Sequence, residues 1–282
     1  MNKKINSTRK IIITLLSFSL SVILALTGLL SVVSLTLLNP RYVVKSLQKS
    51  SFGEIELPRI KEHFISYGAA GNVEESFFID YFKENITAET ITNDMAKSIF
   101  EIYNGIEKEN GNEFSNELYN ALYKYAANMH MDVESKEIQA GIRQFADDLT
   151  ALYNRYTILP YSETISPVIK RASKLMPLAI AFLSLFSIII SVIIFLSYKE
   201  KLNAYLYFAS SLGGTGLMLT AFPLLILITK QAEKFTLTDE ALRSFFIKFM
   251  NGVTACTIMC GVVFLIISTI LYYYAISKKS KT

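Results

Sequence analysis

Four stretches of the chain contain no Asp, Glu, Lys or Arg, and each is long enough to cross a lipid bilayer. They cover residues 11–40, 175–198, 202–229 and 249–277. A membrane-spanning α-helix needs about 20 predominantly apolar residues, because each residue advances the helix by only about 1.5 Å. The pattern therefore predicts an all-α protein with four transmembrane helices, surrounded by a lipid bilayer.

The section between the first and second stretches has the composition of a water-exposed domain. Residues 41–174 hold 15 basic and 20 acidic side chains and therefore carry a net charge of −5. Both Cys residues of the chain lie in the fourth apolar stretch, so no disulfide can stabilise this domain. A section of this length can form an independent core by burial alone. We expect a helical domain, because the strand-like alternation of apolar and polar residues is scarce.

These features set the predicted segment boundaries. The first apolar stretch is longer than the core of about 7–15 residues of a secretory signal peptide, and we interpret it as an uncleaved anchor. The predicted segments are a cytoplasmic N-terminus at 1–10, transmembrane helix 1 at 11–38, an extracytoplasmic helical domain at 39–174, transmembrane helix 2 at 175–198, a cytoplasmic loop at 199–201, transmembrane helix 3 at 202–229, an outer loop with an interfacial helix at 230–250, transmembrane helix 4 at 251–277 and a cytoplasmic C-terminus at 278–282.

The orientation follows from the distribution of basic residues. Short cytoplasmic segments of membrane proteins are rich in Lys and Arg. Residues 1–10, 199–201 and 278–282 together contain 9 basic and 1 acidic side chain, whereas the remaining charged segments contain 19 basic and 23 acidic. Basic residues between 170 and 174 oppose this assignment, but the first helix usually dominates orientation. We expect a multi-pass protein of the plasma membrane with both termini in the cytoplasm. The basic ends reflect topology, and no nucleic-acid partner is expected.

Four segments of the predicted domain have the apolar spacing of amphipathic helices. Shorter runs lie at 95–103 and 118–129, and an aromatic run covers 77–82. Gly105 is expected to end the helix that contains 95–103. The chain after Pro40 and the stretch 167–174 are expected to extend the first and second spans outward. The clearest run is Ile138, Ile142, Phe145, Leu149, Leu152 and Tyr156, and loops are expected at 52–58, 68–72, 107–112 and 157–167.

The short segment before the fourth span is patterned as a helix. Thr238 is the expected N-cap, with Asp239 and Glu240 in the first turn, where negative charge favours the helix dipole. Two placements remain open for this helix. It could lie on the outer leaflet as an interfacial helix, or it could pack under the extracytoplasmic domain. Its apolar face is formed by Leu242, Phe245, Phe246 and Phe249.

No set of residues predicts catalysis or metal binding. The two His residues, His63 and His130, are too few for a zinc site in a domain without Cys, so structural roles are preferred. The acidic pairs at 74–75 and 147–148 are adjacent on their helices and point in directions about 100° apart, which prevents both carboxylates from meeting at one point. We therefore expect a protein that is not an enzyme and that binds no cofactor.

Small residues in the third and fourth spans are candidates for helix packing. Helices in lipid approach closely where small side chains meet, because the hydrophobic effect does not drive their association. We predict that the third and fourth spans form the tightest helix pair. Pro223 is a candidate kink, and the same region could instead be a discontinuous helix at a binding site. The packing candidates are Gly213, Gly214, Gly216, Gly252, Cys256 and Cys260.

Three short motifs accompany this layout. Asn39-Pro40 follows the first span, Ile102-Tyr103-Asn104-Gly105 lies in the middle of the domain, and Pro160-Tyr161 precedes the second span. With these motifs, the chain resembles a group of uncharacterised bacterial four-span membrane proteins that have a helical extracytoplasmic domain after the first span. The resemblance implies no activity for any residue.

The layout is also similar to permease subunits of ABC systems of the cell-division and macrolide-exporter kind, whose large outer domain lies between the first two spans. Those proteins couple to an ATPase through an amphipathic cytoplasmic helix before the first span and a sizeable loop between the second and third. Here the corresponding segments are only residues 1–10 and 199–201. This departure argues against coupling to an ATPase.

Two functions from different classes follow from these observations. The first is a non-enzymatic envelope protein whose extracytoplasmic domain binds a partner. The partner is either another protein or a second copy of this chain, and the contact is made through this domain or through the third and fourth spans. The alternative is a transport or channel component, such as a permease-like subunit. The alternative is motivated by the Gly-rich stretch before Pro223 and by the polar residues of the fourth span, which are Asn251, Thr254, Thr257, Ser268 and Thr269.

Overall fold

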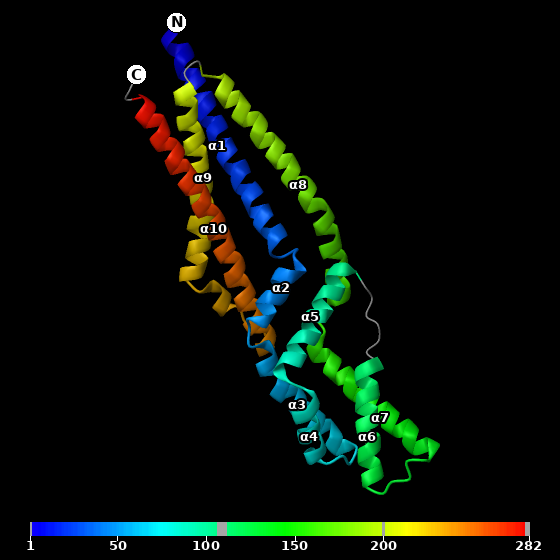
Figure 1. Ribbon diagram of the computed structural model, residues 1–282. Coiled ribbons are helices and arrows are strands. Elements are labelled where there is room, and N and C mark those ends of the chain that lie inside the picture. The colour runs from blue at the N-terminus through cyan, green and yellow to red at the C-terminus, as the bar shows by residue number, and fades with distance from the viewer. Residues whose placement is uncertain (1, 106–111, 199–200, 280–282) are drawn as a thin grey trace. The chain divides into compact units, whose positions relative to one another are not determined.

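The computed structural model describes residues 2–105, 112–198 and 201–279, and all regular secondary structure in these ranges is helical. The all-α prediction is therefore confirmed. The helices (Figure 1) are α1 (Asn2–Leu35), α2 (Pro40–Gln48), α3 (Phe52–Ala70), α4 (Glu75–Asn85), α5 (Ala88–Asn104), α6 (Asn112–Asn128), α7 (Lys136–Thr157), α8 (Ser162–Leu196), α9 (Lys201–Ile228), the 3-10 helix η1 (Gln231–Lys234) and α10 (Glu240–Lys279).

Within the described residues, four helices are long and apolar enough to cross a membrane, and each overlaps one of the four charge-free stretches. The candidate spans are Arg9–Leu35, Ser162–Leu196, Leu202–Ile228 and Glu240–Lys279. The second and fourth contain 35 and 40 residues. A helix of this length exceeds the hydrocarbon thickness of about 30 Å at about 1.5 Å per residue. The first turns of α8 and α10 are therefore extensions beyond the apolar stretches.

The two expected extensions next to the domain differ. The stretch 167–174 continues without a break into the second span as part of α8, as predicted. The first span instead ends at Leu35, and α2 begins at Pro40 as a separate helix. The Asn39 side chain accepts a hydrogen bond from the Arg41 amide at 3.1 Å, and Pro40 occupies the first helical position, where a missing N–H costs nothing.

The chain divides into two compact units. We call the first the span unit; it contains Met1–Tyr42, Arg171–Thr236 and Phe249–Thr282. The second, the inter-span domain, contains Val43–Lys170 and Leu237–Lys248. The domain therefore takes in not only the section between the first two spans but also the start of α10.

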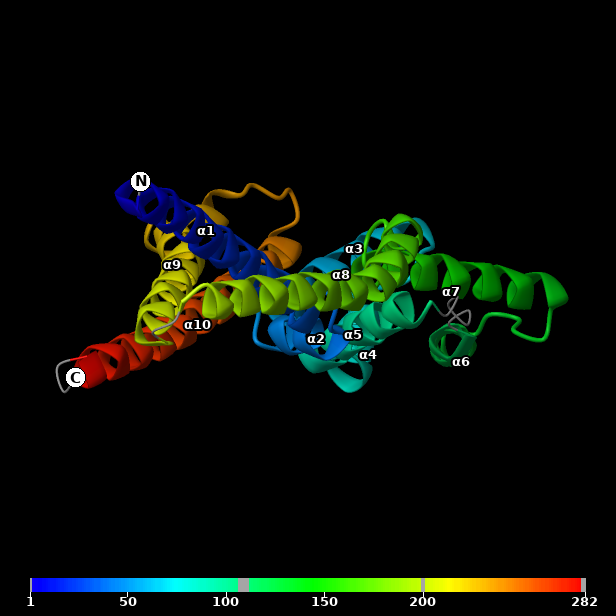
Figure 2. The ribbon, with the colours of Figure 1, turned by 90° about the horizontal axis from the view of Figure 1, so that it is seen from above.

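Within the span unit, α1 packs most extensively against α9 (Figure 2). A line of hydroxyl groups, which we call the hydroxyl seam, joins the two helices. Ser17 and Ser211 share a hydrogen bond of 2.8 Å, and the Ser211 hydroxyl lies 2.9 Å from the Ser17 carbonyl. Thr215 donates to the Ser21 carbonyl at 3.0 Å. Interhelical hydrogen bonds of this kind stabilise helix pairs in lipid, so the largest helix interface joins the first and third spans.

The fourth span contacts the third mainly where two glycines meet. A Cβ atom on Gly216 would lie 2.9 Å from the Gly261 carbonyl oxygen, and a Cβ on Gly261 would lie 2.9 Å from the Gly216 carbonyl oxygen. Ser268 adds a hydrogen bond of 2.7 Å to the Ala209 carbonyl. Glycine at both positions is required because any side chain would force the two backbones apart.

The core of the inter-span domain forms around α3, which packs against α4, α5 and α7. Every fourth residue of α3 from Phe52 to Phe64 is buried, which places Phe52, Glu56, Ile60 and Phe64 on one face. The predicted loop at 52–58 is wrong, because α3 already begins at Phe52. Pro58 suggested a loop, but it lies inside α3, where burial of the apolar face outweighs the lost hydrogen bond.

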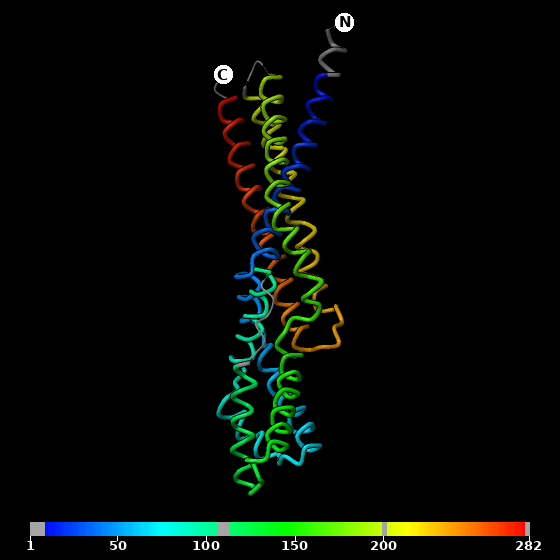
Figure 3. The backbone as a smooth tube through the Cα atoms, turned by 90° about the vertical axis from the view of Figure 1, so that its right-hand side faces the viewer, coloured from blue at the N-terminus to red at the C-terminus, as the bar shows by residue number. Residues whose placement is uncertain are grey.

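The other predicted helices of the domain are confirmed as α4, α5, α6 and α7. Helices α6 and α7 run side by side (Figure 3). Gly105 ends α5 in the left-handed conformation, with φ of 65°, as predicted. The loop expected at 157–167 is shorter than predicted, because α7 ends at Thr157 and α8 begins at Ser162. Residues 107–111 of another expected loop lie outside the described residues.

Helix α7 confirms the strongest helical prediction, but its buried face differs in detail. Leu149 is fully buried, as expected from the predicted stripe. Phe145 instead lies at the edge, where its ring stacks on Tyr67 with centroids 5.4 Å apart. Ala146 and Tyr153 are the other buried residues at the centre of the face. Thr150 and Thr157 are buried as well, so the buried face lies mostly one position after the predicted stripe.

Candidate functional site

The first turn of α10 belongs to the inter-span domain and is capped by Asp239. The Asp239 carboxylate accepts a hydrogen bond of 2.8 Å from the Leu242 amide, and its carbonyl accepts one of 3.0 Å from the Arg243 amide. The predicted cap, Thr238, lies one residue too early. Two placements were left open for the segment before the fourth span. Residues Leu237–Lys248 belong to the inter-span domain, which corresponds to the placement against that domain.

Asp239 belongs to a cluster of three charged residues. The Arg59 guanidinium lies 2.9 Å from both the Glu56 and the Asp239 carboxylates. Glu56 is only 1% exposed, and its second carboxylate oxygen has no hydrogen-bond partner among the described residues. Burial, followed by the nearby charge of Asp239, raises the pKa of Glu56 to about 7. Glu56 is therefore the one carboxyl of this cluster that can take up a proton near neutral pH.

Asp239 behaves in the opposite way. Burial works to raise its pKa, but hydrogen bonds from the Leu242 amide and from Arg59 outweigh burial and lower the pKa below its ordinary value. Asp239 therefore stays ionised and keeps its ion pair with Arg59. The cluster is structural, because it joins α3 to the start of α10 inside one domain.

The residues considered for catalysis or metal binding do not come together. His63 is paired with the Tyr156 hydroxyl at 3.3 Å, and His130 lies in a turn after α6 with φ of 60°. Asp147 accepts a hydrogen bond of 2.6 Å from Ser115, whereas Asp148 accepts one of 2.8 Å from Tyr67. Among the described residues, no three His, Cys, Asp or Glu side chains are close enough to hold a metal ion.

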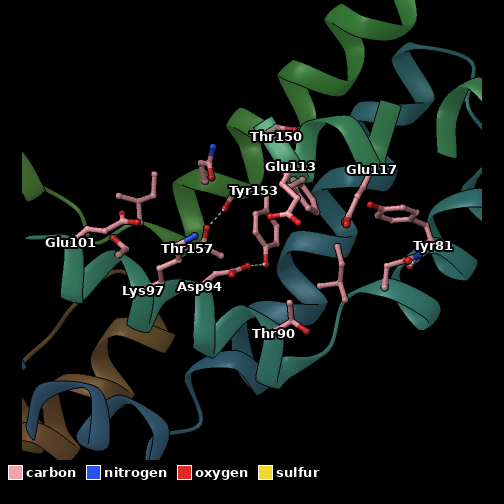
Figure 4. Close-up of a pocket in the computed structure, with 16 residues that line it drawn as sticks. Tyr81, Thr90, Asp94, Lys97, Glu101, Glu113, Glu117, Thr150, Tyr153 and Thr157 are labelled. Carbon is pink, nitrogen blue, oxygen red and sulfur yellow. Dashed lines mark hydrogen bonds between the residues drawn. The ribbon is translucent and has the colours of Figure 1, made fainter. Parts of the chain in front are cut away.

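The domain contains an open cavity of about 270 Å³ between α4, α5, α6 and α7 (Figure 4). We call it the acidic cavity, because four carboxyl groups and one Lys line it. The charged residues are Asp94, Lys97, Glu101, Glu113 and Glu117, and the remaining lining residues are Tyr81, Asn85, Ile86, Thr90, Ser98, Phe114, Thr150, Tyr153, Asn154, Thr157 and Ile158.

One wall of the acidic cavity is held by Tyr153. Its hydroxyl donates to Asp94 at 2.6 Å, a bond visible in Figure 4, and its ring stacks on Phe114 with centroids 4.5 Å apart. Burial raises the pKa of Tyr153, and the bond to Asp94 adds to this effect. The Tyr153 phenol is therefore neutral, and it orients Asp94 as a fixed carboxylate next to an aromatic face.

The other end of the acidic cavity holds an unsatisfied hydroxyl group. Tyr81 is 7% exposed, and its hydroxyl has no hydrogen-bond partner among the described residues. Figure 4 shows this hydroxyl pointing toward the Glu117 carboxyl. Burial, and then the charge of Glu117, raise the pKa of Tyr81 to about 12. A buried polar group without a partner costs free energy, and such groups mark sites that a ligand or water completes.

The packing candidates of the third span face two different helices. A Cβ on Gly213 would lie 3.0 Å from the Ser268 hydroxyl of α10, and Gly216 faces Gly261 of the same helix. Gly214 instead faces Ser21 of α1, whose hydroxyl oxygen would lie 2.5 Å from an added Cβ. Helix α9 runs without interruption through this stretch and Pro223, so the described residues contain no discontinuous helix there. The kink at Pro223 stays a prediction.

The packing candidates of the fourth span face a different neighbour from the one expected. Gly252 leaves room for the Tyr42 hydroxyl of α2, and the Cys256 sulfur lies 3.6 Å from the same hydroxyl. The Cys260 sulfur lies beside Gly28 of α1, 3.6 Å from the position of an added Cβ. The small residues at steps of four thus pack against α1 and α2, whereas Gly261 and Ser268 contact α9.

Sequence reasoning missed the acidic cavity, because its lining comes from four helices that are not predictable as neighbours. One signal was available: Asp94, Lys97 and Glu101 are spaced by three and four residues, which places them on one face of α5. No protein-family model, curated protein or solved structure matches the chain. Function therefore has to be argued from the site alone.

Proposed function

We propose that this chain is a multi-pass envelope protein whose inter-span domain lies outside the cytoplasm and binds a partner without catalysing a reaction. The observation that supports this most directly is the acidic cavity, which opens on a domain with its own buried core. Its hydroxyl–carboxylate pair, Tyr153 and Asp94, is a fixed contact that orients one wall of the cavity. Recognition, rather than chemistry, is what this arrangement favours.

The orientation can be tested with a thiol reagent that does not cross the membrane. In a variant without Cys256 and Cys260, a single Cys at Asn128 of the inter-span domain should react in intact cells. A single Cys at Ser277, near the end of α10, should react only after the membrane is permeabilised. The reverse pattern would place the domain in the cytoplasm and overturn the proposal.

Partner binding can be tested by purifying the full chain in detergent and identifying the molecules that remain bound. The test variant is Glu113→Gln/Glu117→Gln, which removes two cavity charges at exposed positions, and Glu62→Gln is its matched control. A partner that is lost from the test variant, and retained by Glu62→Gln on the exposed face of α3, would support binding at the cavity. Identical partner sets for all three proteins would contradict it.

The alternative, a transport or channel component, finds less support in the described residues. The hydroxyls of Thr254 and Thr257 bond to carbonyls of their own helix at 2.8 and 2.9 Å, and Ser268 bonds to α9. These three hydroxyls are thus satisfied by helix backbone. Helix α9 is continuous through Gly213 and Pro223, so the stretch that motivated the alternative has the form of an ordinary helix.

A further inference from the structure

The acidic cavity has features that define the chemistry of a ligand. Four of its five charged side chains are carboxylates, so its potential favours a cation. The carboxylates are spread along the cavity. Among the described residues, no three His, Cys, Asp or Glu side chains are close enough together to hold a metal ion. A cation that fits must therefore carry its charge on an organic body.

The unsatisfied Tyr81 hydroxyl indicates where the charge of such a ligand would lie. Its oxygen can accept a hydrogen bond from an N–H group, and it faces the Glu117 carboxylate, which can neutralise a positive charge. The phenol remains un-ionised at neutral pH, since its pKa is raised to about 12. The end of the cavity near Tyr81 and Glu117 thus offers the two acceptors that an ammonium group requires.

Another part of the cavity offers an aromatic surface. The Phe114 and Tyr153 rings are stacked, and together they present aromatic surface to the cavity. Aromatic rings attract both flat apolar groups and cations. The volume of about 270 Å³ lies near the lower limit of roughly 300 Å³ for small-molecule pockets, which suits a small ligand.

Resting on the proposed function of the inter-span domain, we propose that the acidic cavity binds a small organic amine. Its ammonium group lies between the Tyr81 hydroxyl and the Glu117 carboxylate, and its apolar body packs against Phe114 and Tyr153. The carboxylates of Glu113 and of Asp94, which is held by Tyr153, also line the cavity and attract the ammonium group over a longer distance.

The test uses the full chain in detergent and three probes of nearly equal size, titrated by calorimetry. The probes are the phenethylammonium ion, the neutral 2-phenylethanol and the anionic phenylacetate. We expect the ammonium ion to bind at least about fivefold more tightly than the alcohol, and phenylacetate not to bind. Equal affinities for the ammonium ion and the alcohol, or no heat of binding with any probe, would overturn the proposal.

Variants locate the site. Glu117→Gln should weaken phenethylammonium binding by about threefold to tenfold, and Tyr81→Phe should weaken it without changing the thermal unfolding of the protein. Glu62→Gln, an exposed carboxyl of α3 outside the cavity, should leave binding unchanged. Binding that is insensitive to both Glu117→Gln and Tyr81→Phe would place the amine elsewhere and contradict the proposal.

A second readout uses the absence of Trp from the chain. Phe114→Trp introduces a single indole in the aromatic wall, whose emission should change on addition of phenethylammonium and not on addition of phenylacetate. An emission that responds equally to both probes would contradict the proposal. This titration does not depend on membrane orientation or on co-purifying molecules, so its failure is distinct from failure of the proposed function.

Discussion

Arg59 of α3 and Asp239 at the start of α10 form an ion pair of 2.9 Å, although 180 positions separate them in the sequence. Glu56 shares the same guanidinium at the same distance. Glu56 is the buried member of the cluster, so loss of Arg59 would leave its carboxylate uncompensated, which is costly. This contact therefore fixes the segment Leu237–Lys248 on the inter-span domain, and it makes the attachment sensitive to the protonation of Glu56.

The stability of the protein should increase as the pH falls from 8 to 5. The folded chain protonates Glu56 at about pH 7, whereas an unfolded chain protonates it only near the ordinary value of 4.5. The folded state therefore binds the proton first, which stabilises it by about 2 kcal/mol across this window. Asp239 does not titrate there, since its pKa lies below 3.8.

Thermal unfolding of the full chain in detergent, followed by circular dichroism, checks this prediction. Glu56→Gln carries no titrating proton and should lose most of the pH dependence between pH 5 and 8. Glu62→Gln on the exposed face of the same helix should keep it. Parallel pH profiles for the wild type and Glu56→Gln would show that another group is responsible.

The crossing of α9 and α10 should not tolerate a methyl group. In Gly216→Ala, the new Cβ would lie 2.9 Å from the Gly261 carbonyl oxygen and 2.6 Å from Leu265. We expect a loss of about 1–3 kcal/mol, because backbone atoms cannot move away as side chains can. The matched control is Gly141→Ala in α7, where an added Cβ meets nothing within 4 Å. It should be neutral or stabilising by about 0.5–1 kcal/mol.

The hydroxyl seam should contribute measurably to the packing of α1 and α9. Ser211→Ala removes the bonds to the Ser17 hydroxyl and carbonyl, and we expect a loss of about 1 kcal/mol. Ser210→Ala is the neighbouring control, because the Ser210 hydroxyl is exposed and bonds only to the Leu206 carbonyl of its own helix. Equal unfolding temperatures for the two variants would mean that the seam adds nothing to stability.

The core of the inter-span domain should depend on Leu149. This side chain is fully buried in α7, and Leu149→Ala should cost about 2–5 kcal/mol through lost burial and the remaining cavity. Gln144→Ala, five residues earlier at an exposed position of α7, should cost less than about 1 kcal/mol. Denaturant unfolding of both variants in detergent gives the comparison, and a mild effect of Leu149→Ala would place the core elsewhere.

The spans and most helices of the domain could be predicted from the sequence, because charge-free length and apolar spacing are local properties. Pro58 misled the prediction at the start of α3, since the burial of Phe52 and Phe64 that overrides it depends on other helices. The role of small residues such as Cys256 in helix packing could be predicted, but the neighbouring helix that they contact could not. The acidic cavity could not be predicted, because Tyr81 and Glu117 meet only in the folded domain.

The hydroxyl seam also constrains how the protein can be made. Ser17 and Ser211 are 194 positions apart, and the partner helix of α1 is thus synthesised long after α1 itself. During translation, residues 43–170 of the inter-span domain and α8 are produced after α1 and before α9. Biosynthesis therefore separates the synthesis of the first span from its assembly with the third.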